Sequence, residues 1–71
     1  MSAQISELKK QKFYCLTNMD NFKTLIEDYE TYGSPLGVEF CNAQIEFHQS
    51  CLESCRTEFM QIDSELAALD N

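Results

Sequence analysis

The sequence predicts an all-α fold, an antiparallel two-helix hairpin that resembles a coiled coil and dimerises into a four-helix bundle. Apolar residues recur at alternating spacings of three and four along two long stretches of the chain. Gly33-Ser34-Pro35 stands between the stretches, and the chain has only two glycines and one proline, so little else can form turns. With 71 residues, the chain is long enough for one domain at most. We therefore expect residues 1–71 to form a single helical hairpin domain.

The first helix is expected over about residues 3–32. Ser2 or Ser6 can serve as its N-cap. Lys12 is the one charged interruption of its seam, and a single polar residue at such a position often fixes the register of a coiled coil. We expect the Lys12 side chain to reach toward Glu58. The seam comprises Ile5, Leu8, Cys15, Met19, Phe22, Ile26 and Tyr29.

A short turn at residues 33–34 is expected to join the helices. Gly33 suits the position after a helix end, where glycine enters the left-handed conformation without steric cost. Ser34 then caps the second helix, and Pro35 takes its first position, where a missing N–H does no harm. A connection this short makes the helices antiparallel.

The second helix is expected over about residues 35–69. Glu39, Glu46 and Glu53 lie a heptad apart on its outer side, as expected for a solvated face. Gly37 is unusual in the first turn of a helix. The seam comprises Val38, Cys41, Ile45, His48, Leu52, Cys55, Phe59, Ile62 and Leu66.

The seams also predict a register, because antiparallel coiled coils place a residues opposite d residues. Centring the turn between Gly33 and Ser34 pairs the seams throughout. The expected pairs are Tyr29 with Val38, Ile26 with Cys41, Phe22 with Ile45, Met19 with His48, Cys15 with Leu52, and Leu8 with Phe59.

Several apolar residues lie beside the seams rather than on them. Phe40 and Phe47 are a heptad apart, and a single hairpin leaves them in water. A second hairpin packed alongside would bury them, because exposed apolar stripes usually mark interfaces. The predicted interface comprises Phe13, Leu16, Leu25, Tyr32, Phe40, Phe47 and Cys51.

The four cysteines are more consistent with small buried apolar residues than with a metal site. His48, Cys51 and Cys55 share one helix face, but Cys41 lies roughly 15 Å from Cys51 along the axis, so one tetrahedral zinc cannot gather all four side chains. We predict no metal and no cofactor; the weaker alternative is a metal or redox module that uses His48, Cys51 and Cys55. A bridge from Cys15 to Cys51 or Cys55 is sterically conceivable, whereas free thiols are expected in a reducing compartment.

No group of residues indicates catalysis. His48 is the only histidine, and a nucleophile and an orienting carboxylate around it are not evident. A narrow coiled seam also leaves no pocket for a substrate. We therefore expect a non-enzymatic protein, with His48 a core or interface residue that makes a hydrogen bond.

The charge disfavours nucleic acid and anionic membrane as direct partners. The net charge is −7, and residues 24–71 carry only Arg56 against ten acidic side chains. No apolar run approaches the ~20 residues that span a bilayer, and the start of the chain shows no secretory signal. These features predict an intracellular location, in the cytoplasm or nucleus.

Three stretches carry a family resemblance. Leu8-Lys9-Lys10-Gln11-Lys12, then Asn21 to Leu25 with the letters NFKTL, and then the glutamate-rich stretch from Val38 to Leu66 resemble the helical segment near the start of Gag polyproteins of insect Bel/Pao-type retrotransposons, and host proteins derived from them. That family has leucines and a tryptophan or phenylalanine where this chain has Cys41, Cys51 and Cys55. The resemblance implies a self-assembly or protein-interaction segment without catalytic residues.

The predicted function is therefore protein–protein interaction, with homodimerisation of the hairpin as the leading form, inside a larger assembly or chain. The alternative is an acidic, stand-alone binder or inhibitor that docks on a basic protein surface. In that case Glu39, Glu46 and Glu53 would form the contact face.

Overall fold

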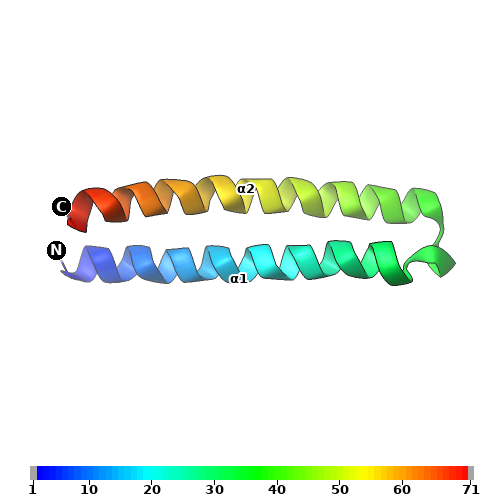
Figure 1. Cartoon of the computed structure of the whole chain (residues 1–71), viewed down its shortest axis with the longest axis horizontal. Coiled ribbons are helices and arrows are strands. Elements are labelled where there is room, and N and C mark those ends of the chain that lie inside the picture. The colour runs from blue at the N-terminus through cyan, green and yellow to red at the C-terminus, as the bar shows by residue number, and fades with distance from the viewer. Residues whose placement is uncertain (1, 71) are drawn as a thin grey trace.

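Two long antiparallel helices make up almost the whole chain. The computed structural model describes residues 2–70, in which α1 (Ser2–Tyr32) is followed by a short 3-10 helix, η1 (Ser34–Leu36), and by α2 (Val38–Asp70). The described residues contain no strand. The helices run side by side, with both chain ends at one end of the molecule (Figure 1). The prediction of an all-α, two-helix hairpin is therefore confirmed.

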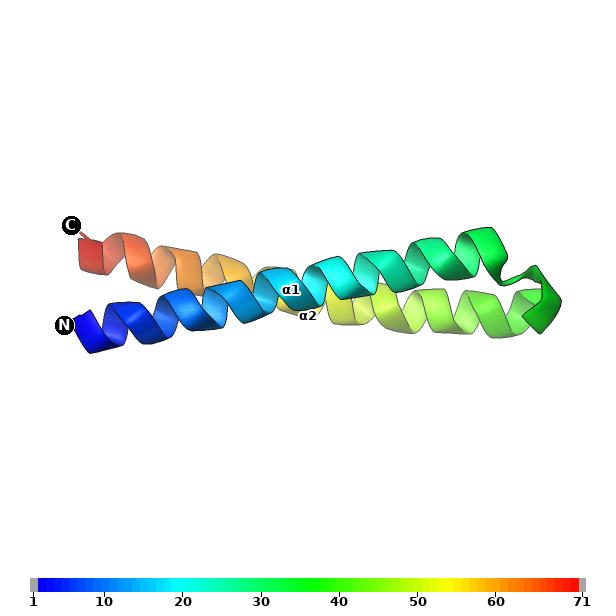
Figure 2. The same cartoon turned by 90° about the horizontal axis from the view of Figure 1, so that it is seen from below.

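The hairpin is a narrow rod. Its Cα atoms extend over 52 × 14 × 12 Å. In the perpendicular view, α1 crosses α2 near the middle of the rod, so the helices wind around each other (Figure 2). This winding keeps a seam of spacing 3.5 facing the other helix over many turns.

The turn differs from the predicted turn, because it takes up residues 33–37. The backbone of Gly33 is right-handed, with φ −80° and ψ −7°, and Gly37 holds the positive φ of 99° instead. The Gly37 carbonyl accepts the first hydrogen bond of α2, from Cys41 N at 3.1 Å. The prediction that Ser34 caps α2 and Pro35 begins it is therefore wrong. Both residues lie in η1, whose two closing bonds run from Leu36 N to Gly33 O and from Gly37 N to Ser34 O.

Gly33 is needed for a different reason than a left-handed backbone. A Cβ on this buried residue would collide with the carbonyl oxygen of Tyr29 and lie 2.5 Å from the sulfur of Cys41. The Cys41 thiol donates a hydrogen bond of 2.9 Å to the Gly33 carbonyl oxygen. The absence of a side chain at Gly33 thus lets the first turn of α2 pack directly against the end of α1.

The longer turn shifts the register. His48, which was predicted opposite Met19, has its ring between those of Phe22 and Tyr29, with centroid distances of 6.0 and 5.9 Å. It therefore lies about one heptad nearer to the turn along α1 than predicted. The expected Tyr29–Val38 pair is absent, because Tyr29 packs against Phe40 and His48. Val38, at the very start of α2, is 72% exposed, so its assignment to the hairpin core is wrong.

Lys12 also has a different partner from the one expected. Its Nζ lies 2.7 Å from Asp63 Oδ1 and 5.2 Å from the centre of the Phe59 ring. The register shift explains why Asp63 takes the place of Glu58. Both ends of the ion pair are partly exposed, so the pair contributes little to stability.

The core is thin, because two helices can cover only one seam of each other. Among the described residues, six apolar side chains are buried, and the remaining predicted core residues other than Val38 are half-buried. Toward the chain ends, Ile5, Phe59 and Leu69 flank a cluster of buried side chains. The buried residues are Leu8, Cys15, Ile26, Cys41, Ile62 and Leu66; the half-buried ones are Ile5, Met19, Phe22, Tyr29, Ile45, His48, Leu52, Cys55 and Phe59.

Candidate interaction surface

Near the turn, the space between the helices is filled by aromatic rings. His48 stacks on Phe22 and Tyr29 at interplanar angles of 27° and 21°. Phe47 tilts against His48 with ring centroids 5.4 Å apart, and the Phe40 and Tyr29 rings form an edge-type pair with centroids 6.2 Å apart. The rings thus form a layer that supports the outer rings of Phe40 and Phe47 from beneath. Each of these two outer side chains remains about half exposed.

The outer rings belong to an exposed apolar surface, which we name the turn-end patch. A shallow groove between the end of α1 and η1 joins its α1 residues to Leu36, and Tyr29 also lines this groove. Such side chains are common singly on surfaces, but a contiguous group of them marks an interaction site. The patch comprises Leu25 (39% exposed), Tyr32 (74%), Leu36 (60%), Phe40 (48%) and Phe47 (53%).

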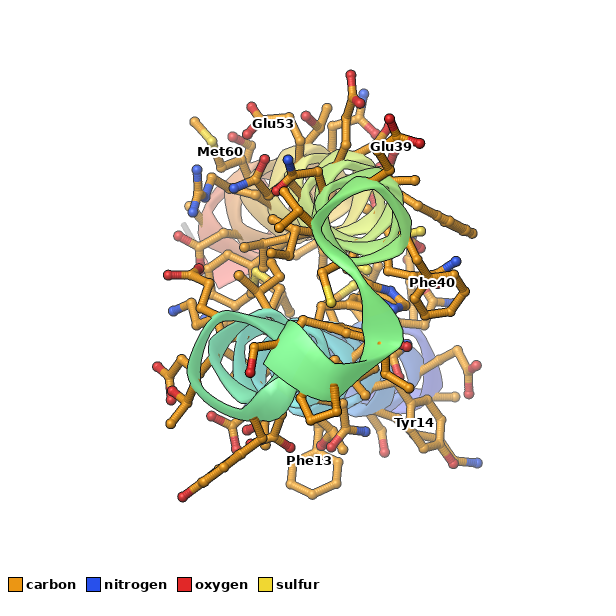
Figure 3. All side chains as sticks on the ribbon, turned by 90° about the vertical axis from the view of Figure 1, so that its right-hand side faces the viewer. Phe13, Tyr14, Glu39, Phe40, Glu53 and Met60 are labelled. Atoms are coloured by element: carbon orange, nitrogen blue, oxygen red, sulfur yellow. The ribbon has the colours of Figure 1, made fainter. Side chains whose placement is uncertain are left out.

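The patch lies on one lateral side of the hairpin, which we name the Phe40 side. Seen along the rod, Phe40 and Tyr14 point to the same side, whereas Glu39 and Glu53 point away from α1 over the back of α2 (Figure 3). Residues a heptad apart share a side, so the side of Tyr14 also carries Glu7 and Asp28. By the same spacing, Glu58 and Glu65 share the heptad position of Cys51, beside that of Phe40 and Phe47.

Within residues 2–70, the Phe40 side carries no basic residue. Lys9 and Lys23 share the heptad position of Leu16 on the opposite side, where Arg56 also falls. Lys10 faces outward from α1, and Lys12 lies over the core beside Asp63. The Phe40 side is therefore apolar near the turn, apart from Asp28, and acidic toward the chain ends.

The predicted interface residues do not all meet on one face. Leu25, Tyr32, Phe40 and Phe47 lie in the turn-end patch, and half-buried Cys51 lies near its inner edge by heptad position. Phe13 projects from the back of α1 (Figure 3), and Leu16 lines a separate groove along α1. The predicted set thus combines residues from different sides of the hairpin. The prediction counted apolar side chains beside each seam without distinguishing the Phe40 side from the opposite side.

One member of the patch was missed. The expected second helix, about residues 35–69, included Leu36 in its first turn, whereas the structure places Leu36 in η1, where it lines the same groove as Tyr32. The proline before it was the available signal, because a 3-10 turn is common next to an α-helix end. Tyr14 and Met60 are also exposed, at 55% and 63%, and Met60 points toward the back of α2 (Figure 3).

The thiols and the histidine do not gather into a metal-binding group. Within residues 2–70, no three His, Cys, Asp or Glu side chains lie close enough together to hold a metal ion. All four cysteines are free, and Cys15 and Cys41 are buried. Burial, reinforced by the nearby Glu58 carboxylate and Cys55 thiol, raises the pKa of the Cys15 thiol above its usual 9.0. Cys15 is therefore a protonated core residue at neutral pH.

His48 does not make the hydrogen bond that was expected of it. Its Nδ1 is buried and has no hydrogen-bond partner among the described residues. The ring packs between Phe22 and Tyr29 and contributes as a flat apolar surface.

None of the described helices contains a segment long and apolar enough to cross a membrane.

Comparison of the chain with protein-family models, with curated proteins and with solved structures found no match in any of the three.

Proposed function

We propose that this chain is a non-catalytic protein-interaction module that homodimerises through the turn-end patch. The observation that carries the proposal is the concentration of five exposed apolar side chains at one end of one side, with no basic residue among them. The hairpin buries few side chains of its own, and a second copy would bury these as well. Where the two copies overlap, four helices pack together as a bundle.

The resemblance to retrotransposon Gag segments supports a self-assembly role within a larger chain or assembly. The free state of all four cysteines supports a reducing location, in the cytoplasm or nucleus.

Sedimentation equilibrium on the whole chain, with Phe40→Gln and Phe13→Gln as paired variants, tests the proposal. Both phenylalanines are exposed, but only Phe40 belongs to the patch. We expect the mass of the wild-type chain to approach twice 8.2 kDa as concentration rises. Phe40→Gln should weaken dimerisation at least tenfold, which is the effect of about 1.4 kcal/mol at an interface hot spot. Phe13→Gln should leave the dissociation constant unchanged.

Circular dichroism should show that both variants keep a helical hairpin. A wild-type chain that stays monomeric, or equal losses in the two variants, would contradict the proposal.

The second candidate function is docking on a basic protein surface. Glu39 and Glu53 project from the back of α2, away from the turn-end patch, and Glu46 lies one heptad from each (Figure 3). The Arg56 side chain bonds to this stripe, with Nη1 3.3 Å from Glu53 Oε2. Replacing all three glutamates by glutamine should abolish salt-sensitive binding to a lysine-rich peptide if this function holds, and should leave dimerisation unchanged.

A further inference from the structure

The position of the turn-end patch along the rod restricts how two copies can meet. The patch lies in the half of the Phe40 side that is nearer to the turn. On α2 the patch ends at Phe47, with Cys51 beyond it, and on α1 it begins at Leu25. At the rise of an α-helix, the patch spans about 17 Å along a rod that is 52 Å long. A closed dimer uses the same surface of both copies, so patch must meet patch around a two-fold axis.

Two arrangements satisfy this condition. In a side-by-side arrangement, the axis runs along the rods, both turns lie at one end, and the Phe40 sides meet over their full length. In an opposed arrangement, the axis is perpendicular to the rods, which point in opposite directions and overlap only at their turn halves.

The charges of the Phe40 side distinguish the two arrangements. Beyond the patch, toward the chain ends, this side carries Glu7, Glu58 and Glu65, all exposed, and no lysine or arginine among the residues that the structure describes. Side by side, each of these carboxylates would face the acidic half of the other copy with no cation to offset the repulsion. In the opposed arrangement, the two acidic halves extend away from each other into solvent.

A complete overlap of opposed rods is also unfavourable, because it would cover each patch with the glutamate-bearing half of the other copy. Carboxylates buried against apolar rings lose their hydration without gaining a partner. Only the partial overlap buries both patches and leaves these glutamates in water.

We propose that two copies of this chain pair turn to turn, as opposed rods that overlap only over the turn-end patches. This inference rests on the proposed homodimerisation and specifies its geometry. The resulting particle is about 85 Å long, from two rods of 52 Å that share the patch. The N- and C-termini of each copy lie together at a free end (Figure 1). Any domains attached there would be held at opposite ends of the particle.

Small-angle scattering from the whole chain, at a concentration where sedimentation shows a dimer, tests this geometry. The radius of gyration of one hairpin is 16.0 Å for its Cα atoms. We expect the dimer to have a radius about 1.5-fold larger, because the rod lengthens rather than thickens. A side-by-side dimer would keep a radius close to that of one hairpin.

Two charge variants provide a second, independent measurement. Asp28 lines the groove of the patch and lies near the two-fold axis, so Asp28→Asn should strengthen dimerisation severalfold by removing a like-charge contact. Glu65→Gln removes an exposed carboxylate of the opposite half. It should leave the dissociation constant within twofold of the wild-type value, whereas in a side-by-side dimer it should strengthen dimerisation as Asp28→Asn does.

The outcomes separate the two proposals. A compact dimer, a Glu65→Gln variant that dimerises more tightly, or an Asp28→Asn variant without effect would overturn the opposed geometry while leaving homodimerisation intact. A chain that remains monomeric would overturn the proposed function and this inference together. An elongated dimer that is insensitive to Phe40→Gln would place the contact elsewhere and overturn both.

Discussion

At the residue scale, the two glycines of the turn illustrate two different reasons for the same amino acid. Gly33 has an ordinary backbone and no room for a side chain, whereas Gly37 has ample room and a backbone that L-residues avoid. A sequence shows both as a glycine near a proline. The distinction depends on where Tyr29 and Cys41 lie, so it is tertiary information.

Replacing Gly33 by alanine should destabilise the hairpin by roughly 1–3 kcal/mol, because the new Cβ must displace the Tyr29 carbonyl or the Cys41 sulfur. Urea unfolding followed by circular dichroism measures the change. Ser34→Ala is the matched control, because η1 has no side-chain capping hydrogen bond. A Gly33→Ala variant as stable as Ser34→Ala would show that the close approach of α2 does not matter.

Replacing Gly37 by alanine should also destabilise the hairpin, by roughly 1–3 kcal/mol, but through backbone strain at its positive φ. A chemically synthesised chain with D-alanine distinguishes the two causes. D-alanine favours positive φ, so at position 37 it should restore the stability lost with L-alanine. Failure of D-alanine to do so would argue against this backbone conformation.

Cys15 predicts how stability changes at alkaline pH. Its pKa is raised in the folded state, so the folded chain holds this proton more tightly than the unfolded chain. The resulting stabilisation is complete below about pH 9 and is lost as pH rises through the folded-state pKa. The free energy of unfolding should therefore fall more steeply above pH 9 in wild type than in Cys15→Ala.

Cys51→Ala, at a half-buried position, serves as the control for that titration. Because this variant keeps the Cys15 thiol, its free energy of unfolding should fall as steeply above pH 9 as that of wild type. Parallel curves for wild type and Cys15→Ala would rule out a contribution from this thiol.

At the element scale, the heptad pattern specifies which side of each helix is covered but leaves the pairing of positions open. Sliding one helix by a heptad keeps every seam residue on the seam, so the seam alone permits several registers. The length of the turn selects among them. The five residues 33–37 that separate the α-helices bring His48 between Phe22 and Tyr29 and Asp63 to Lys12.

Two neighbouring positions of α2 test the difference between seam and surface. Ile62 is 5% exposed within the core cluster, so Ile62→Ala should cost about 2–4 kcal/mol of unfolding free energy. Asp63 is 58% exposed and pairs with Lys12, so Asp63→Asn should cost at most about 1 kcal/mol. Thermal unfolding of the two variants under one buffer compares them directly, and a larger loss for Asp63→Asn would contradict the assigned register.

At the scale of the whole molecule, a rod of two helices buries little and exposes much. Six buried apolar side chains among the described residues are few for a chain of this length, and Phe40 and Phe47 remain about half exposed. The small core and the partly exposed aromatic side chains are the physical reason for expecting a second copy. The proposed interaction surface accordingly lies at the turn end, where exposed aromatic residues gather.

If dimerisation contributes to stability, the thermal midpoint should rise with chain concentration, because association favours the folded state by mass action. Phe40→Gln should remove this dependence, whereas Phe13→Gln should retain it. A wild-type midpoint that is constant over a hundredfold range of concentration would indicate that the hairpin is stable alone.

The helices, their antiparallel order and most of the seam follow from the sequence by itself. Hydrophobic periodicity and the placement of glycine and proline are local signals, because they can be recognised from short stretches of the sequence. The exception is Val38, which satisfies the period yet lies in water because α2 begins there.

The tertiary structure decided the conformation of the turn, the register that depends on it, and the side of the hairpin on which each flanking residue falls. These depend on distances between residues far apart in the chain, such as Gly33 with Cys41 or Lys12 with Asp63. A seam that repeats every heptad cannot encode them, because every register separated by seven residues satisfies it equally. Only the packed turn, where one missing Cβ lets α2 approach α1, selects among them.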